Sequence, residues 1–244
     1  MKRAKEEFEN RKIEIEKYFE FLSKLDNDNP TLHYSITGSE KLFVVDDELL
    51  KVLKANGFLL IYNLVEAVTR ISLIEFLNSI TKSKVPFKKL NQDIQRLWVA
   101  NKRFADKSIK NKSEEVIFQE LYDEIVSNTV ISFTTELKND KGELVKEFVE
   151  LSGNVDARKI RKLASKYGFD SNVGNANEKA GADLEVIKTK RNYLAHGRIT
   201  FVECGKGYSV RQMCDYKDNA IIYLEKILSN IESHIDGKKY RKSK

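Results

Sequence analysis

The chain has 244 residues, of which 41% are hydrophobic and 33% charged, and it contains only two prolines and 11 glycines. This length allows a full hydrophobic core, and the composition favours long helices over a β-sandwich or barrel. The net charge is +6, but residues 238–244 carry five positive charges and no acid, which leaves +1 for the rest. We therefore expect residues 237–244 to form a disordered basic tail.

The sequence offers no pattern for a bound metal or cofactor. Its two cysteines, Cys204 and Cys214, do not form a CxxC pair, and its three histidines lack metal-ligand spacing. No apolar run approaches the ~20 residues of a membrane-spanning helix, and the charged N-terminus is unlike a signal segment. We therefore expect a cytoplasmic protein with reduced thiols, no cofactor and no metal.

The first 45 residues are expected to form an N-terminal segment, 1–45, that precedes the main domain. Residues 2–25 have the pattern of an amphipathic helix, and residues 26–30 contain turn-forming side chains that end it. Residues 31–45 are harder to interpret. Apolar side chains alternate there, which fits a short extended piece, at Leu32, Tyr34 and Ile36.

The main domain is expected to span residues 46–236 and to begin with a long apolar helix. Asp46 or Asp47 is a suitable N-cap. The strongly apolar character that continues to about Lys82 indicates a central helix buried on several sides. Gly57 interrupts this stretch, so it either kinks the helix or separates two helices.

Three polar residues share one strip of this apolar helix. Asn63 and Glu66 are three residues apart, and Glu66 and Arg70 are four apart, so all three are neighbours on the helix surface. A buried carboxylate without a partner is costly. Glu66 therefore needs Arg70 as a purely local partner, contact with solvent, or another partner.

The middle of the chain contains further candidate elements. Pro86 suits the start of a helix that runs to about Phe104, and Ser113 suits the N-cap of the next helix. Residues 130–151 fit a hairpin around a turn at 138–142, although the second arm also has helical spacing.

A basic helix is predicted after this region. Asn154 is a plausible N-cap, and the helix would run from Val155 to about Tyr167. Arg158 and Lys159 lie on its basic side. This side is either an RNA or partner surface or simply a solvated face.

The chain is expected to end in two helices joined by a short hairpin or a pair of loops. The first helix runs from about Ala180 and stops at Gly197, a residue type suited to a left-handed C-terminal cap. Residues 199–210 have the pattern of this hairpin or loop pair. Ser209 then begins a capping box for the final helix, and His234 is expected at the surface near the end of that helix.

Side chains suited to RNA cleavage gather where the first of these helices ends. Asn192 and His196 are four residues apart and share a face, and the long side chain of Arg191 can reach the same place. A guanidinium binds phosphate through two hydrogen bonds and stays charged, while an imidazole transfers protons near neutral pH. Lys190 adds a candidate RNA contact. The alternative is an ordinary helix end, where basic residues are common.

Resemblance to a known family favours the first interpretation. The stretch Arg191-Asn-Tyr-Leu-Ala-His196 is similar to the Arg-x4–6-His motif of HEPN-domain ribonucleases. Three more blocks, 62–66, 152–161 and 223–228, resemble HEPN-like nucleases of prokaryotic defence and toxin–antitoxin loci. The resemblance covers residues 46–236. It implies a mainly α, HEPN-like antiparallel helical bundle, here with an added N-terminal helix and one or two short hairpins.

The same resemblance implies a metal-independent endoribonuclease that acts as a homodimer, with two Arg–His motifs facing each other in one cleft. The 2′-hydroxyl of RNA would be the nucleophile. Arg191 would hold the scissile phosphate, His196 would act as acid or base, and Asn192 would orient them. Members of the family often place a polar residue of an earlier helix against the motif. The candidates for this supporting role are Glu66, Asn63 and Arg70.

Two alternatives remain open. One is a catalytically silent module with the HEPN fold that binds nucleotides or a partner protein. The other is a toxin silenced by an antitoxin or defence-system partner. In one HEPN branch a partner enzyme modifies a tyrosine two residues beyond the histidine, but Arg198 occupies that position here, so this form of control is not expected.

Overall fold

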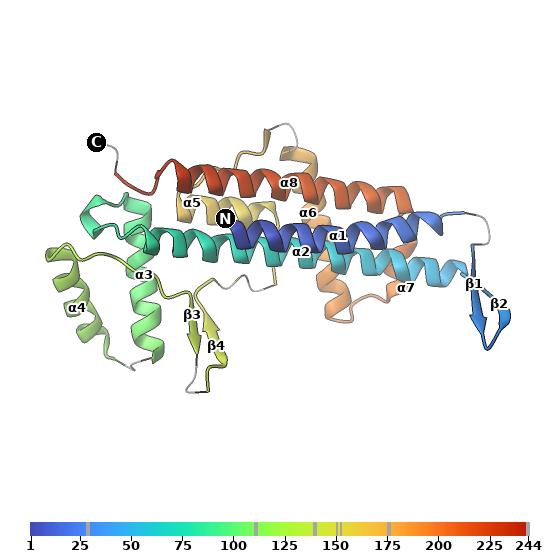
Figure 1. Cartoon of the computed structure of the whole chain (residues 1–244), viewed down its shortest axis with the longest axis horizontal. Helices are drawn as coiled ribbons and strands as arrows, with labels where there is room; N and C mark the ends of the chain where they lie inside the picture. The colour runs from blue at the N-terminus through green and yellow to red at the C-terminus, as the bar shows by residue number, and fades with distance from the viewer. Residues whose placement is uncertain are drawn as a thin grey trace.

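The computed structural model describes residues 1–27, 30–109, 112–138, 141–149, 151, 153–174 and 177–242. This described part of the chain is mainly α, as predicted, and the helices form an elongated bundle (Figure 1). The helices are α1 (Lys2–Lys24), α2 (Asp47–Lys82), α3 (Gln92–Ile109), α4 (Glu114–Val126), α5 (Ala157–Tyr167), α6 (Asn177–Ala195), α7 (Phe201–Lys206) and α8 (Val210–Asp236).

The first of two small hairpins projects from one end of the bundle (Figure 1). Strand β1 (Thr31–Ile36) pairs antiparallel with β2 (Ser39–Val44). The turn residues Thr37 and Gly38 both have positive φ angles, +48° and +80°, as a tight hairpin turn with the twist of its strands requires. The extended piece predicted at 31–45 is therefore a hairpin.

The second hairpin settles the two interpretations of residues 130–151. Strand β3 (Glu136–Lys138) pairs antiparallel with β4 (Leu144–Glu147), so the second arm begins as a strand. The predicted turn residues Asn139 and Asp140 lie outside the described residues.

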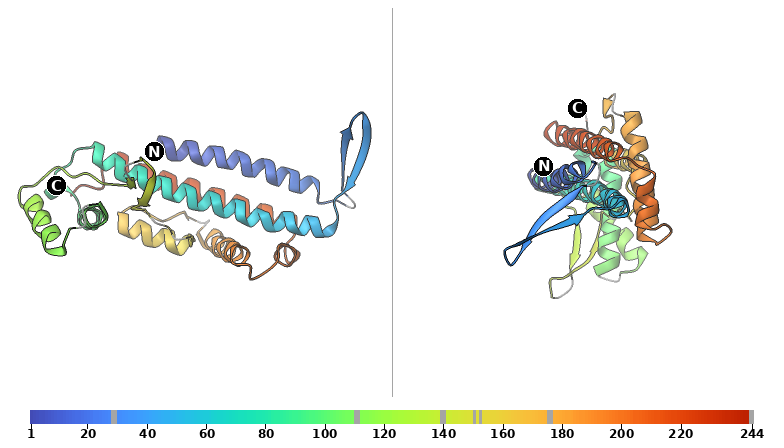
Figure 2. Two further views of the ribbon diagram at one scale, coloured as in Figure 1. Left: turned by 90° about the horizontal axis from the view of Figure 1, so that it is seen from below. Right: turned by 90° about the vertical axis from the view of Figure 1, so that its right-hand side faces the viewer.

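Helix α2 lies at the centre of the bundle and contacts α1, α6, α7 and α8. Helices α1 and α8 run alongside it, and α5, α6 and α7 lie along its other side (Figure 2). By length and composition α2 is the one described helix that could cross a membrane, but 72% of its most apolar window is buried inside the protein. It is thus the central buried helix that the sequence predicted.

Gly57 does not divide α2 into two helices, because the helix is continuous over 36 residues. A Cβ at Gly57 would lie 3.0 Å from Met213 Cε and 3.1 Å from Phe19 Cζ. The glycine therefore lets α1 and α8 approach α2 closely. The N-cap of α2 is Asp46, whose Oδ1 accepts a hydrogen bond from the Leu49 N–H at 2.8 Å.

Both ends of the chain pack more closely with the bundle than the sequence suggested. The apolar face of α1 lies in the same core as α2 and α8 through Phe8, Ile15, Phe19 and Leu22. The predicted separation at residue 46 therefore does not divide α1 from the bundle core. The tail is also anchored as far as residue 242, instead of being disordered.

Hydrogen bonds and one aromatic side chain hold the described part of the tail. The Asn91 N–H donates to the Tyr240 carbonyl at 2.9 Å, and the Lys242 N–H donates to the Lys89 carbonyl at 3.0 Å. The Tyr240 side chain is buried in the core. The positive charges drew the prediction towards disorder, whereas burial of this tyrosine orders the segment.

Local capping explains three further differences from the sequence interpretation. Asp156, and not Asn154, is the N-cap of α5, because its side chain accepts from the Lys159 N–H. Pro86 precedes only a single 3-10 turn, η1 (Phe87–Lys89). Helix α3 begins later, where Asn91 Oδ1 accepts from the Ile94 N–H at 3.0 Å.

The predicted hairpin at 199–210 is wrong, because the short helix α7 occupies this segment. Thr200 and Glu203 form a capping box: the Glu203 N–H donates to Thr200 Oγ1, and Glu203 Oε2 accepts from the Thr200 N–H. Two orphan donors at the helix start are thereby satisfied. The capping box predicted at Ser209 and Gln212 is confirmed.

His234 is buried in α8, whereas the sequence suggested a surface position. Its ring lies 5.4 Å from the ring of Phe76. Burial lowers the pKa of His234, and Lys239 lowers it further, with Asp93 acting in the opposite direction. The histidine therefore belongs to the core of the bundle and is remote from the motif at the end of α6.

Helix α7 packs backbone to backbone against α2 at Gly205. A Cβ on this residue would lie 1.9 Å from the Lys51 carbonyl oxygen.

We expect Gly205→Ala to force the two helices apart and to lower the free energy of unfolding by ~3 kcal/mol, the upper end of overpacking costs. Urea unfolding followed by circular dichroism measures this. Gly207→Ala is the control, because nothing lies within 4 Å of its added Cβ; equal stabilities of the two variants would contradict this packing.

Candidate functional site

The end of α6 has the geometry that its sequence predicts. Gly197 has a φ of +63°. Its N–H donates to the Leu194 carbonyl at 3.1 Å, and the Arg198 N–H donates to the Tyr193 carbonyl at 2.8 Å. These two bonds constitute a Schellman motif, which stops the helix and satisfies its last carbonyls. The motif residues of α6 are thereby held on a defined helix end.

The guanidinium of Arg191 lies between side chains of α2 and α6. Its Cζ atom lies 4.5 Å from the ring centroid of Tyr62. Nη2 lies 3.9 Å from Glu66 Oε2, and Nη1 donates to Asn192 Oδ1 at 3.0 Å. The predicted set of Arg191, Asn192 and Glu66 is thus brought together.

The expected interaction energies indicate which of these contacts contributes most to the position of the Arg191 guanidinium. A cation over an aromatic ring contributes ~1–2 kcal/mol when partly desolvated. An ion pair at the limit of contact, with both side chains 29% exposed, contributes at most ~1 kcal/mol. The contact with the Tyr62 ring therefore contributes more to the position of the guanidinium, and Glu66 mainly balances the charge of the guanidinium.

The chain segment 153–156 encloses the same arginine from the other side. The Gly153 carbonyl accepts from Arg191 Nη1 at 3.4 Å, and a Cβ on Gly153 would lie 3.1 Å from that nitrogen. Asn154 Oδ1 accepts from Asn192 Nδ2 at 2.8 Å. A side chain larger than hydrogen at Gly153 would therefore displace the guanidinium.

The next two residues fasten this segment to α2 and α6. The Val155 N–H donates to the Tyr62 hydroxyl at 3.1 Å, and Asp156 Oδ2 accepts from Lys188 Nζ at 2.6 Å. Burial raises the pKa of Tyr62. Burial alone would also raise the pKa of Asp156, but hydrogen bonds from Lys188 and from the Lys159 N–H outweigh it, and the pKa is lowered. Asp156 is therefore a charged anchor.

His196 differs from its neighbours because it is exposed at the surface. In the part of the chain that the structure describes, its imidazole has no hydrogen-bond or ion-pair partner. Asn192, one turn earlier, connects this end of the helix to Arg191. The imidazole is thus free to meet a ligand or a second protein chain.

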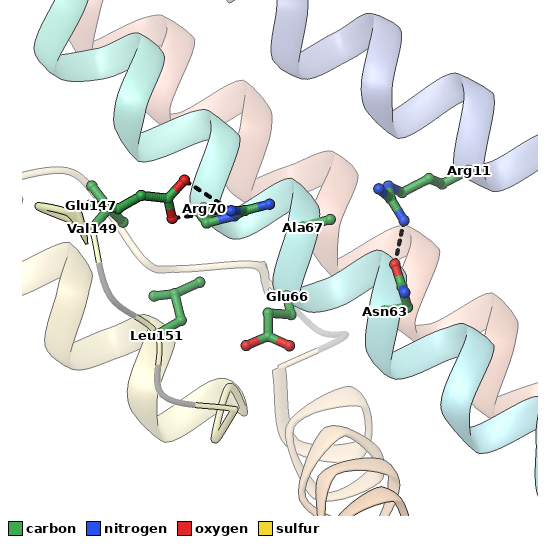
Figure 3. A pocket seen from close by; sticks show the side chains of 8 residues that line it. All are labelled: Arg11, Asn63, Glu66, Ala67, Arg70, Glu147, Val149 and Leu151. Carbon is green, nitrogen blue, oxygen red and sulfur yellow. Dashed lines mark hydrogen bonds and ion pairs between the residues drawn. The ribbon is translucent and has the colours of Figure 1, made fainter. Parts of the chain in front are cut away.

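The other two supporting residues belong to a groove beside this site. Asn63 Oδ1 accepts from Arg11 Nη1 of α1. Arg70 Nη1 donates to both carboxylate oxygens of Glu147 at 3.0 Å (Figure 3). The local Glu66–Arg70 pair considered from the sequence is not formed, because each of the two residues has a different partner.

The three tentative RNA-binding residues do not gather at the motif. Arg158 is exposed on α5, and Lys159 is half-buried on the same helix. Lys190 Nζ lies 5.4 Å from the ring centroid of Tyr208. The side chain of Lys190 thus lies against Tyr208, two residues before α8, and does not join Arg191.

Sequence reasoning missed Tyr62, Gly153 and Asn154 as parts of the site. All three lie in the blocks 62–66 and 152–161 that carried the family resemblance, although Ser152 itself lies outside the described residues. The sequence therefore marked these blocks through the family resemblance, but only the fold shows that their described residues lie close to Arg191.

The described residues contain no group of three or more His, Cys, Asp or Glu side chains placed to hold a metal ion. A family model described as MAE_28990-like HEPN matches residues 2–240. Comparisons with curated proteins and with solved structures find no match.

Asp156 offers a direct test of how the segment 153–156 is held. We expect Asp156→Ala to lower the free energy of unfolding by ~2–3 kcal/mol, because it removes both the N-cap and the partner of a half-buried lysine. Asp156→Asn keeps a good N-cap and should lose about half as much. Chemical unfolding of both variants measures the difference. Equal losses would show that the ion pair with Lys188 contributes nothing.

Proposed function

Because the chain belongs to the MAE_28990-like HEPN family, we propose that it is an endoribonuclease of antiphage defence or a toxin, which cleaves RNA by attack of the 2′-hydroxyl without a metal ion. The observation that carries the proposal is the enclosure of Arg191 by Tyr62, Glu66 and Gly153, on the helix that ends just before the exposed His196. A pre-oriented guanidinium and a free imidazole are the two groups that this reaction needs.

The reaction assigns one role to each residue. Arg191 binds the non-bridging oxygens of the scissile phosphate and stabilises the charge that builds up on them. Neutral His196 takes the proton from the 2′-hydroxyl, and the 2′-oxygen forms a bond to phosphorus. The bond from phosphorus to the 5′-oxygen breaks, that oxygen receives a proton, and a cyclic phosphate remains. Asn192 keeps Arg191 in place through its amide oxygen.

A second copy of the chain supplies the proton donor in this proposal. One imidazole cannot act as base and acid in the same step, and His196 has no partner among the described residues. In a cytoplasmic homodimer the partner's His196 protonates the leaving oxygen. Arg158, Lys159 and Lys190 then serve as outer RNA contacts, and an antitoxin or defence-system partner restrains the enzyme.

One observation favours a second candidate function. A catalytic histidine is usually oriented by a second group, whereas the described chain provides none for His196. This geometry also fits a module with the HEPN fold that binds nucleotides or a partner without chemistry of its own.

Cleavage of RNA by point variants separates the two functions. We expect His196→Ala to reduce cleavage of labelled single-stranded RNA by 10²-fold or more, as loss of a general acid–base group does. His33→Ala on the exposed hairpin is the matched control and should cleave like the wild type. All reactions contain a chelator, and cyclic phosphate ends identify the chemistry. The nuclease proposal would be contradicted if His196→Ala cleaved RNA as fast as the wild type, or if the wild type did not cleave RNA.

A further inference from the structure

A groove of about 540 Å³ lies next to the site, between α1, α2 and the residues Glu147, Val149 and Leu151 (Figure 3). Its size is within the range of small-molecule sites in proteins. Five of its eight lining side chains are polar or charged, so it is more polar than most small-molecule sites and suits a charged ligand. The lining residues are Arg11, Asn63, Glu66, Ala67, Arg70, Glu147, Val149 and Leu151.

Two guanidiniums in this groove retain unused hydrogen-bond donors. Arg70 contacts Glu147 through Nη1 only, so within the described structure its Nε and Nη2 edge has no partner. Arg11 uses Nε for Glu7 and Nη1 for Asn63, which leaves its Nη2. A guanidinium carries five N–H donors, and a free edge fits two phosphate oxygens. The groove can therefore bind a phosphate without breaking its own ion pairs.

The rest of the lining suits the base of a nucleotide. Ala67, Val149 and Leu151 provide an apolar surface for the flat face of a base. The Asn63 amide nitrogen and the Glu66 carboxylate offer a donor and an acceptor for its edge. Only an unpaired base exposes both its face and its edge in this way.

Glu66 connects the groove to the motif. It lines the groove and its Oε2 lies 3.9 Å from Arg191 Nη2. A ligand in the groove is thus adjacent to the guanidinium that contacts the scissile phosphate in the proposed reaction.

We infer that this groove binds the ribonucleotide next to the scissile phosphate of single-stranded RNA. Arg70 and Arg11 contact phosphate oxygens, and Asn63 and Glu66 contact the base. The inference rests on the proposed function for the identity of the neighbouring phosphate. Glu147 keeps a negative charge in the groove beside the bound phosphate, and this repulsion limits the affinity for RNA.

Binding of RNA to an inactive protein tests the groove without requiring cleavage. The His196→Ala protein is titrated into a fluorescein-labelled single-stranded RNA of about ten nucleotides, and anisotropy gives Kd at several salt concentrations. We expect Arg11→Ala and Arg70→Gln each to weaken binding 5- to 10-fold. The negative slope of log affinity against log salt concentration should become shallower by ~0.7 for each phosphate group that a variant no longer neutralises.

The ion pair between Lys12 and Glu225 supplies matched controls. Lys12 follows Arg11 on α1, and its Nζ lies 3.0 Å from Glu225 Oε1 of α8; neither residue lines the groove. Lys12→Ala removes the same charge as Arg11→Ala and should change Kd less than twofold with an unchanged salt slope. Glu147→Gln should tighten binding about threefold, whereas Glu225→Gln should not. Thermal unfolding checks that each variant is folded.

The outcomes separate the groove from the nuclease proposal. If Arg11→Ala and Arg70→Gln bind RNA as tightly as Lys12→Ala, the groove inference is overturned even where the wild type cleaves RNA. If binding depends on the groove but the wild type does not cleave, the groove stands and the nuclease proposal falls. The inference is also overturned if the protein binds free ribonucleoside monophosphates but not RNA, or if it binds neither ligand.

Discussion

The structure depends on burying a 36-residue apolar helix on nearly all sides. Helices α1, α6, α7 and α8 cover α2, so a charged or strongly polar side chain on it needs either solvent or a specific partner. Tyr62 and Glu66 meet this requirement at Arg191, and Asn63 meets it at Arg11. The helix that forms the core thus also positions the groups around the motif arginine.

Fixing a guanidinium before a ligand arrives has a chemical consequence. The guanidinium lies over the ring of Tyr62, and the segment 153–156 contacts Arg191 and Asn192 through backbone and side-chain groups. A pre-oriented cation stabilises developing negative charge without reorganisation during the reaction. The exposed His196 is the complementary part, since it is not held by the described chain and is available to a substrate or to a second copy.

Local signals in the sequence predicted the fold where the cause is local. The helix caps could be predicted from the sequence, because a cap depends on neighbouring residues. They are the left-handed Gly197, the N-caps Asp46 and Ser113, and Ser209 at the start of α8. Features that depend on tertiary packing could not be predicted from the sequence. Gly57 suggested a break in α2, but its lack of a side chain leaves room for Phe19 of α1. The charged tail is ordered because the side chain of Tyr240 is buried. At the site, the contact of Glu66 with Arg191 was one of two alternatives, and the enclosing segment 153–156 emerged only from the fold.

The most direct measurement concerns the Arg191 guanidinium itself. The Nε–Hε resonances of ¹⁵N-labelled His196→Ala protein are recorded by NMR, and Arg191→Lys assigns the signal. On titration with short single-stranded RNA, we predict a shift of the Arg191 resonance, with no shift for Arg103, which pairs with Glu114 at the far end of the molecule. Saturable RNA binding that leaves the Arg191 resonance unchanged would contradict its role as the phosphate-binding group.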